Sequence, residues 1–386
     1  MRMAMSYQQT TTGVKKSPPD TPVGWTEERL AALRSARALA HGSRTLWEIA
    51  RHTGGRFLPP ASAEERTAWP LTDSQKERLA ASWREPIEPL AEYLDRHGIC
   101  AIFADDPGYP AELLRIPDPP YVIFLRGTPL RDEVRIAIVG TRRMTSYGRR
   151  SAAFFGGELG RAGITVVSGL ATGIDAESHR ACIDAGGRAV AVLPGGVDDA
   201  SVVPRSNMTL VRDILAADGT LASEHLPGTD MKPYSFLYRN RIIAGLSNAV
   251  LIVEGDHDSG ALVTARLALE QGKEVLAVPG SIWSRASKGP NRLLADGARL
   301  CESMQDIWEA LGMDGREARR TTQARSGLPP TPAENCILEL CGEERTADEL
   351  ARLSGFSAQE VASALSLLEL KGRILNVGPK TFLRLP

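Results

Sequence analysis

The sequence predicts an α/β protein whose central domain is a doubly wound parallel sheet, with a helical domain before it and a winged-helix-like domain after it. Three observations lead to this prediction. Short apolar runs rich in valine and isoleucine recur between residues 97 and 312, glycine-bearing turns follow them, and stretches of ten or more residues with helical spacing separate them. Such runs are typical of strands buried on both faces, and their alternation with helices is typical of a parallel sheet.

The elements of the central domain are placed by this pattern. Expected strands cover residues 98–103, 121–127, 136–140, 164–169, 189–196, 221–224, 249–255 and 275–280. Expected helices cover residues 147–162, 174–185, 206–217, 236–246, 261–271 and 303–311. A parallel sheet binds its ligand beyond the carboxyl ends of the strands, where the N–H groups of the following helices point. We therefore expect the functional residues just after these strands.

The chain before the central domain falls into two parts. Residues 1–24 are polar and poor in bulky apolar side chains, so we expect a disordered tail. Residues 25–96 show short helical patterns separated by glycine-containing turns, which predict an N-terminal helical domain of the SAM or helix-hairpin kind. Such a domain serves either as an interaction module or as a structural cap on the central domain.

The chain after the central domain also has two parts. Residues 313–331 are charged, contain glycine and proline and lack an apolar period, which predicts a linker. Residues 332–386 show three helical patterns followed by a hairpin with a Gly-Pro turn, which is the winged-helix layout. The third helix lacks the side chains of a DNA-reading helix, so protein interaction and DNA contact both remain open.

Composition limits the possible functions. The 46 lysines and arginines balance 47 aspartates and glutamates, so binding to a nucleic acid requires a local basic patch. The five scattered cysteines form no CxxC pair, which argues against a disulfide framework or a zinc site and favours a reducing cytoplasm. No apolar run reaches the length of a membrane span, and no signal peptide is recognisable. We expect a cytoplasmic protein without a membrane or metal partner.

The turns after two neighbouring strands offer groups that bind phosphate. Residues 168–175 read SGLATGID, in which the glycines allow close backbone approach and consecutive N–H groups can form an anion nest. Arg142 follows the preceding strand and carries a planar guanidinium that can bind phosphate through two hydrogen bonds. The candidate phosphate-binding residues here are Gly140, Arg142, Arg143, Ser168, Gly169, Leu170, Ala171, Thr172 and Gly173.

Later turns add further candidates. They are Arg205, Phe236, Arg239, Asn240 and Arg241. The arginines either line the same crevice or form salt bridges with acidic residues at neighbouring strand ends, such as Glu224, Glu254 and Asp256. Ser259 and Gly260 begin another helix and also suit an anion.

No complete catalytic set is recognisable. Asp175 and His179 are four residues apart on one expected helix, and with no nucleophile beside them a structural pair is favoured over a catalytic dyad. Residues 256–258 read DHD and suit a loop better than a metal site. The chain has neither a GxGxxG fingerprint nor a GxxxxGK[ST] loop, which argues against dinucleotide binding and triphosphate hydrolysis.

The sequence resembles the DNA-processing protein A (DprA/Smf) family. The matching motifs are YPAELLRIPDPPYVIFLRG, IAIVGTRRMTSYG, VVSGLATGIDAESHRACIDAGG, AVLPGGVD, SEHLPG, RNRIIAGLS, VLIVEGDHDSGALVTARLALEQGKEVLAVPG and KGPNRLLADGA. They follow one another in family order over residues 108–298. The resemblance implies an extended Rossmann-like domain that binds single-stranded DNA, a role in natural transformation and competence, loading of the RecA recombinase, and a homodimer without cofactor or enzymatic activity.

The resemblance also assigns residues. It implies that Arg142 and Arg205 contact phosphate, that residues 168–173 form the nest and that residues 239–241 match the RNR motif. The chain departs from the family pattern at Val203-Pro204 and at Phe236-Leu237, where Phe236 remains a candidate for base stacking. Dimer candidates are Ile307, Trp308 and Leu311, although such helix positions are often core.

Two rival interpretations remain. A Rossmann-like nucleotide-phosphate hydrolase carries a PGGxGTxxE motif, and residues 193–196 read LPGG. The sequence continues with VDDAS, without the glycine-threonine pair and the glutamate. A scaffold that binds only protein is the other alternative, and it predicts no affinity for DNA at low salt.

Overall fold

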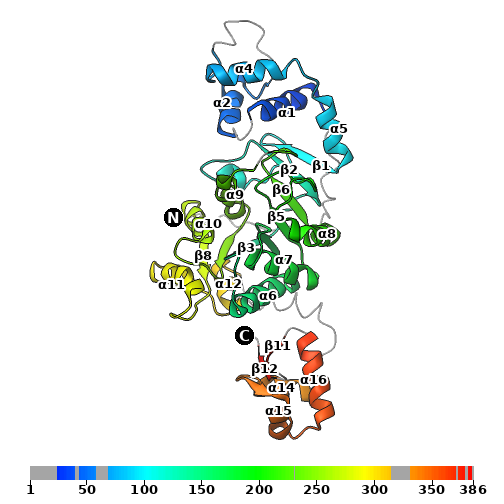
Figure 1. Cartoon of the computed structure of the whole chain (residues 1–386), viewed down its shortest axis with the longest axis vertical. Helices are drawn as coiled ribbons and strands as arrows, with labels where there is room; N and C mark the ends of the chain where they lie inside the picture. Colours follow the sequence, from blue (N-terminus) through cyan, green and yellow to red (C-terminus); the bar gives the residue numbers. More distant parts are fainter. Residues whose placement is uncertain are drawn as a thin grey trace, which may run out of the picture.

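The computed structural model describes residues 24–39, 43–57, 68–229, 231–313, 331–370, 373–378 and 381–384. The expected disordered tail and the expected linker lie almost wholly outside these residues. Figure 1 shows a central sheet flanked by helices, with α1, α2, α4 and α5 at one end of the chain's long axis and α14, α15 and α16 at the other. In the part of the chain that is described, no helix combines the length and apolarity needed to cross a bilayer.

The central sheet has nine strands in the order β1-β2-β6-β5-β4-β3-β7-β8-β9. Their bounds are β1 Ile99–Phe103, β2 Val122–Gly127, β3 Arg135–Val139, β4 Thr165–Ser168, β5 Ala189–Val192, β6 Thr220–Ser223, β7 Ala249–Ile252, β8 Glu274–Ala277 and β9 Arg299–Leu300. All pairs from β6 to β9 are parallel. The predicted Rossmann-like sheet is thereby confirmed.

One edge of the sheet is antiparallel, a feature that the predicted parallel sheet did not include. β1 pairs with β2, and β2 with β6, in antiparallel orientation. The connection between β1 and β2 contains only a short 3-10 helix, η1 (Leu113–Arg115), besides turns. A neighbouring pair of strands needs a crossover helix only when it is parallel.

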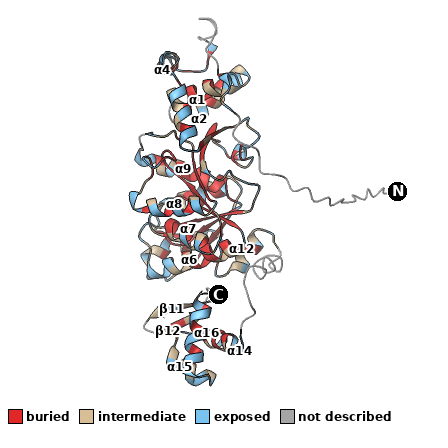
Figure 2. Cartoon of the chain, turned by 90° about the vertical axis from the view of Figure 1, so that its right-hand side faces the viewer, coloured by how far each residue is buried: buried red, intermediate tan, exposed pale blue. Residues whose placement is uncertain are grey.

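Helices cover both faces of the sheet. They are α6 Ser146–Arg161, α7 Ile174–Asp184, α8 Met208–Ala216, α9 Pro233–Gly245, α10 Gly260–Glu270, α11 Lys288–Ala295 and α12 Met304–Ala310. Alternation along β3 sends Ile136 and Ile138 into a core with α6, α7 and α12, whereas Ala137 and Val139 pack against α9 and α10. Figure 2 shows the buried residues concentrated in the sheet and the inner faces of these helices.

The N-terminal helical domain shares its core with the sheet. Its described helices are α1 Glu27–Leu39, α2 Ser43–Thr53, α4 Asp73–Ser82 and α5 Glu88–Arg96. Leu33 and Ile49 belong to the same buried cluster as Phe103 in β1. The indole N–H of Trp47 donates to the carbonyl of Pro119 at 2.9 Å, and its ring packs edge-on against Tyr121 with centroids 5.1 Å apart. The helical domain thus packs on the antiparallel part of the sheet.

The C-terminal unit has its own core. Its helices are α14 Pro332–Leu340, α15 Ala347–Ser354 and α16 Ala358–Leu370, and its strands are β10 Arg345–Thr346, β11 Ile374–Gly378 and β12 Thr381–Arg384. The strands form a sheet in the order β10-β12-β11. Ile337, Leu350 and Leu365 are buried together in this unit. The predicted winged-helix layout is confirmed, with β10 as an additional short strand.

Candidate functional site

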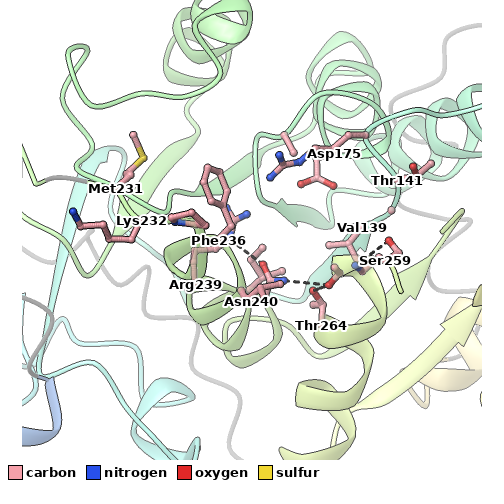
Figure 3. Close-up of a pocket in the computed structure, with 18 residues that line it drawn as sticks. Val139, Thr141, Asp175, Met231, Lys232, Phe236, Arg239, Asn240, Ser259 and Thr264 are labelled. Atoms are coloured by element: carbon pink, nitrogen blue, oxygen red, sulfur yellow. Dashed lines mark hydrogen bonds between the residues drawn. The ribbon is translucent and has the colours of Figure 1, made fainter. Parts of the chain in front are cut away.

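A pocket of about 600 Å³ lies at the carboxyl edge of the parallel strands, between the loops after β3 and β4 and the starts of α9 and α10. The strand order changes direction here, because β3 lies between β4 and β7. Ligands of open α/β sheets bind at such a switch point. Figure 3 shows Asp175 and Thr141 on one side of the pocket and Met231 and Lys232 on the other, with Phe236 between them. The lining residues are Val139, Gly140, Thr141, Arg142, Ala171, Asp175, Met231, Lys232, Pro233, Phe236, Leu237, Arg239, Asn240, Ile243, Ser259, Gly260, Ala261 and Thr264.

The loop after β4, where an anion nest is predicted, is hydrogen-bonded to the side chain of Asp175. The backbone N–H of Gly169 donates to this carboxylate at 3.1 Å. Burial raises the pKa of Asp175, while Arg239 and the backbone N–H groups of Ala171, Gly169 and Gly140 act in the opposite direction. In this structure the loop N–H groups therefore bind an internal carboxylate, and the predicted phosphate contact of this loop stays a prediction.

A second buried carboxylate occupies the start of α6. Glu254 follows β7 and is 1% exposed. It accepts a hydrogen bond from the backbone N–H of Thr145 at 2.9 Å and another from the Thr145 hydroxyl at 2.5 Å. Thr145 is the N-cap of α6, so this helix start is also neutralised internally.

Arg239 connects the start of α9 to the ends of β4 and β5. Its guanidinium donates to the carbonyl of Gly169 at 2.9 Å and to the carbonyl of Val192. A Cβ atom at Gly169 would lie 2.5 Å from the same guanidinium, so a larger residue there would displace Arg239 from this position. Burial lowers the pKa of Arg239 to about 10, which leaves it charged at neutral pH and opposite Asp175. Arg239 therefore holds the pocket wall in place.

Arg142 and Phe236 form the rim of the pocket. The guanidinium of Arg142 lies over the Phe236 ring, 4.9 Å from its centroid. Arg142 is exposed and has no ion pair among the described residues. Lys232, at the start of α9, is also exposed and lines the same pocket. These three side chains combine free positive charge with an aromatic face, which is the chemistry of single-strand binding sites.

The start of α10 also lies at this pocket. Its N-cap is Ser259, whose hydroxyl accepts from the N–H of Ala261 at 3.3 Å. Both Ser259 and Gly260 line the pocket. Unlike α6 and α7, this helix start is not occupied by a carboxylate among the hydrogen bonds of the described chain. It remains available to a phosphate.

Several predicted site residues lie away from the pocket lining. Ser168 is buried and its hydroxyl donates to the carbonyl of Ile138 at 2.6 Å, and Leu170 is fully buried with a positive φ of 57°. Arg143 and Thr172 are exposed outside the lining. The exposed Arg205 donates to the backbone carbonyl of Asp199.

Arg241 forms a salt bridge with Glu224, one of the acidic residues considered as partners of these arginines. Its guanidinium is 2.6 Å from the buried carboxylate of Glu224 and 3.4 Å from Asp118. Glu224 also accepts from the hydroxyl of Ser43 in the helical domain at 3.3 Å. The two outer members of the RNR motif thus play different parts, because Arg239 faces the pocket and Arg241 faces the interface with the helical domain.

Two other expectations meet a different geometry. Ile307 is 0% exposed and Trp308 6% exposed in the core under α12, and Leu311 packs against the same cluster. The structure thus does not offer Ile307 and Trp308 as a free dimer surface, since the amphipathic helix turns them inward. His179 is fully buried and makes no hydrogen bond to Asp175, whose carboxylate turns back to the loop before α7.

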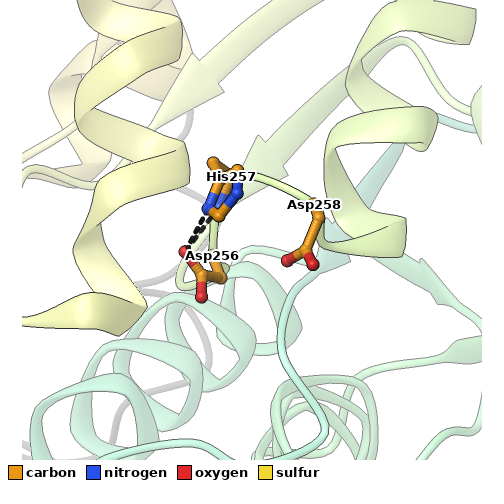
Figure 4. Close-up of side chains that lie close together, drawn as sticks. All are labelled: Asp256, His257 and Asp258. Atoms are coloured by element: carbon orange, nitrogen blue, oxygen red, sulfur yellow. Dashed lines mark hydrogen bonds and ion pairs between the residues drawn. The ribbon is translucent and has the colours of Figure 1, made fainter.

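The acidic loop after β7 has internal partners. Figure 4 shows Asp256 joined to His257, with no interaction drawn to Asp258. Asp256 accepts from the ring nitrogen of His257 at 2.8 Å and pairs with Arg285. These contacts hold the pKa of Asp256 well below its usual value. These contacts favour the interpretation that Asp256, His257 and Asp258 stabilise the loop rather than bind a metal ion.

Sequence reasoning missed part of the pocket. Lys232, Met231 and Thr264 line it without having been singled out. Lys232 directly precedes Pro233, the first residue of α9. Because proline is favoured at the first position of a helix, Pro233 is the signal from which this helix start, and Lys232 with it, could have been predicted.

Comparisons with known proteins agree with the fold. Residues 100–312 match the family model described as DNA recombination-mediator protein A, and residues 321–378 match the DprA winged helix domain. The chain is 36% identical to Protein Smf of Escherichia coli over 322 residues, which covers 82% of this chain and 85% of that protein. It is 44% identical to DNA processing protein DprA of Bacillus subtilis over 224 residues, covering 58% of this chain and 74% of that protein.

A solved structure supports the same assignment. The crystal structure of DprA from Streptococcus pneumoniae aligns with a TM-score of 0.62 and 25% sequence identity, and the match covers 75% of this chain and 98% of that one. The family models, the two relatives and this fold agree with the collinear motifs of the sequence. The chain belongs to the DNA-processing protein A (DprA/Smf) family.

Proposed function

We propose that this protein binds single-stranded DNA across the pocket at the carboxyl edge of its sheet and acts by binding, without catalysing a reaction. The observation that carries the proposal is the Arg142–Phe236 stack on the pocket rim, 4.9 Å from guanidinium to ring centroid. An unpaired cation and an accessible aromatic face suit one phosphate and one adjacent base. Lys232 extends the positive rim on the other side.

The interior of the pocket supports binding rather than catalysis. Asp175 receives backbone N–H groups, and Glu254 holds the N-cap of α6. Both carboxylates are committed to the fold, so neither is placed as a free general base. Burial lowers the pKa of His179 on α7 to about 4, so this residue is neutral at physiological pH.

In this proposal the strand is held through its backbone and its base faces. The Arg142 guanidinium moves from the Phe236 ring to a phosphate, and a base takes its place on the ring. A further phosphate lies at the open start of α10, beside Ser259. Neither contact reads base identity, which agrees with a protein that accepts single strands of any sequence.

The test is affinity for labelled oligo-dT over a range of salt concentrations. Arg142→Ala should weaken binding and flatten the plot of log K against log[salt] by about 0.7, the value for one lost single-strand phosphate contact. Phe236→Ala should weaken binding with the slope unchanged. Arg266→Ala is the matched control, since Arg266 is exposed on α10, pairs with Glu270 and does not line the pocket. Wild-type affinity and slope in Arg142→Ala would contradict this assignment.

The biological setting is a second part of the proposal. The matching family model is described as a recombination mediator, and relatives carry the name DNA processing protein. We infer that the bound strand is passed to the RecA recombinase in the cytoplasm, during natural transformation, and that two copies of the chain act as a homodimer. The expected result is a shorter lag in RecA ATPase activity on single-stranded DNA, lost in Arg142→Ala. Sedimentation velocity tests the dimer.

A further inference from the structure

An exposed tryptophan lies on the loop that follows β8. Trp283 is 91% exposed, and its neighbour Ile282 is 76% exposed. All six tryptophans of the chain fall within described residues, and Trp283 alone among them is largely exposed to solvent. The exposed indole of Trp283 therefore offers a free aromatic face, on which a planar group such as a nucleobase can stack.

The loop is held rigidly by the neighbouring loop after β7. The N–H of Gly255 donates to the carbonyl of Ala286 at 2.6 Å, and the N–H of Gly289 donates to the carbonyl of Gly255 at 2.8 Å. The hydroxyl of Tyr147 donates to the carbonyl of Pro279 at 2.6 Å. The tryptophan is thus presented on a supported turn.

The loop lies on the same edge of the sheet as the pocket. β7 and β8 are parallel neighbours, so the loops that follow them emerge side by side. The loop after β7 ends in Ser259 and Gly260, which line the pocket, and its Gly255 is the residue bonded to the Trp283 loop. The start of α10 and the Trp283 loop are therefore neighbours along this edge of the sheet.

We propose that Trp283 is a base-stacking platform that extends the single-stranded DNA site beyond the pocket. This inference rests on the proposed function. The occupant is a nucleobase, because the exposed group is an aromatic face at the edge where the strand runs, and every base has a π-face that can stack on it.

The charges around the loop indicate stacking rather than phosphate capture. Arg285 is paired with Asp256, and Asp258 faces the same guanidinium. Lys288 is exposed at the start of α11 and has no ion pair in the described chain. The local charge is therefore nearly balanced. Loss of Trp283 should lower affinity without changing the number of counterions released on binding.

The experiment compares full-length wild type, Trp283→Ala and Trp283→Phe for binding to labelled oligo-dT across salt concentrations. Trp283→Ala should weaken binding about fivefold to a hundredfold with an unchanged salt slope, and Trp283→Phe should recover part of the loss. Oligo-dT should quench the intrinsic fluorescence of wild type, and the quenching should shrink in Trp283→Ala. An abasic oligonucleotide should remove the difference between wild type and Trp283→Ala.

Ile282→Ala is the matched control. Ile282 lies on the same turn and is similarly exposed, but it has no aromatic face, so its variant should bind as wild type does. An equal loss in both variants, or a Trp283→Ala protein with wild-type affinity, overturns the stacking assignment. So does a variant that only dissociates a wild-type dimer in sedimentation velocity. If wild type itself does not bind oligo-dT at low salt, the proposed function fails instead.

Discussion

Gly173→Ala should disrupt both the fold and the candidate site, because Gly173 is where the loops after β3 and β4 touch. Gly173 has φ 85° and ψ −133°, a backbone region that is essentially restricted to glycine. An added Cβ would lie 2.3 Å from the carbonyl oxygen of Thr141 and 2.8 and 2.9 Å from the carbonyl carbon and Cα of Arg142. All three are backbone atoms, so no side-chain rotation relieves the contact.

The expected cost has two parts. The backbone conformation contributes about 1–3 kcal/mol of strain, and the overpacked contact adds about 1–3 kcal/mol. Gly186→Ala is the matched control, since Gly186 has φ 76° but no atom would lie within 4 Å of a Cβ added there. That variant should lose only the backbone part, about 1–2 kcal/mol.

Urea unfolding of the two variants measures the difference. Oligo-dT binding at a temperature where both are folded should then show weakened affinity for Gly173→Ala alone, because relief of the clash displaces Arg142. Equal stability losses in the two variants would refute the steric account. Wild-type affinity in Gly173→Ala would show that the contact between the two loops is not needed for DNA binding.

Two further predictions concern buried charges. Burial lowers the pKa of His179 to about 4, against an ordinary value of 6.5. As the pH falls, the unfolded state therefore binds a proton at this histidine before the folded state does. The free energy of unfolding is nearly unaffected above pH 6.5 and falls towards pH 4, by about 2 kcal/mol at pH 5. In urea unfolding at pH 7 and pH 5, His179→Gln should reduce the wild-type loss by that amount, and an undiminished loss would contradict the assignment. Glu224→Gln should cost about 3–5 kcal/mol in unfolding free energy because it leaves Arg241 buried without its main partner. Asp296→Asn, at an exposed pair with Arg292, should cost less than about 1 kcal/mol, and similar losses in both would argue against a structural role for the buried pair.

The Rossmann-like sheet was predictable because its strands carry a local signal. In β3, four consecutive apolar residues face two separate cores, so the run has no polar member and differs clearly from the helices around it. The two-residue strands β9 and β10 carry no such signal and were not predicted. The antiparallel edge could not be predicted for another reason. The orientation of β2 relative to its neighbour depends on its pairing with β6, which is distant in the sequence.

The candidate site was predictable only in its donors. Glycine spacing shows where backbone N–H groups converge, but not to which acceptor they donate. Asp175 stands six residues after Gly169, and only the folded turn brings its carboxylate back to that N–H group. Arg239 and Arg241 have the same chemistry in the sequence, and the rotation of α9 directs them to different partners. The sequence shows which donor groups are present, and only the folded structure shows which acceptor each of them binds.

The internal carboxylates also bear on the proposed course of a bound strand. Asp175 and Glu254 accept hydrogen bonds from the backbone before α7 and at the start of α6, so the N–H groups there are already occupied, and Asp175 lines the pocket. A phosphate is therefore disfavoured deep in the pocket and favoured at its rim, where Arg142 and the open start of α10 remain. We expect the strand to pass over the rim rather than enter the pocket, with bases directed at the Phe236 face. That course continues onto the loop that presents Trp283, which is why the two aromatic variants should weaken binding with unchanged salt slopes.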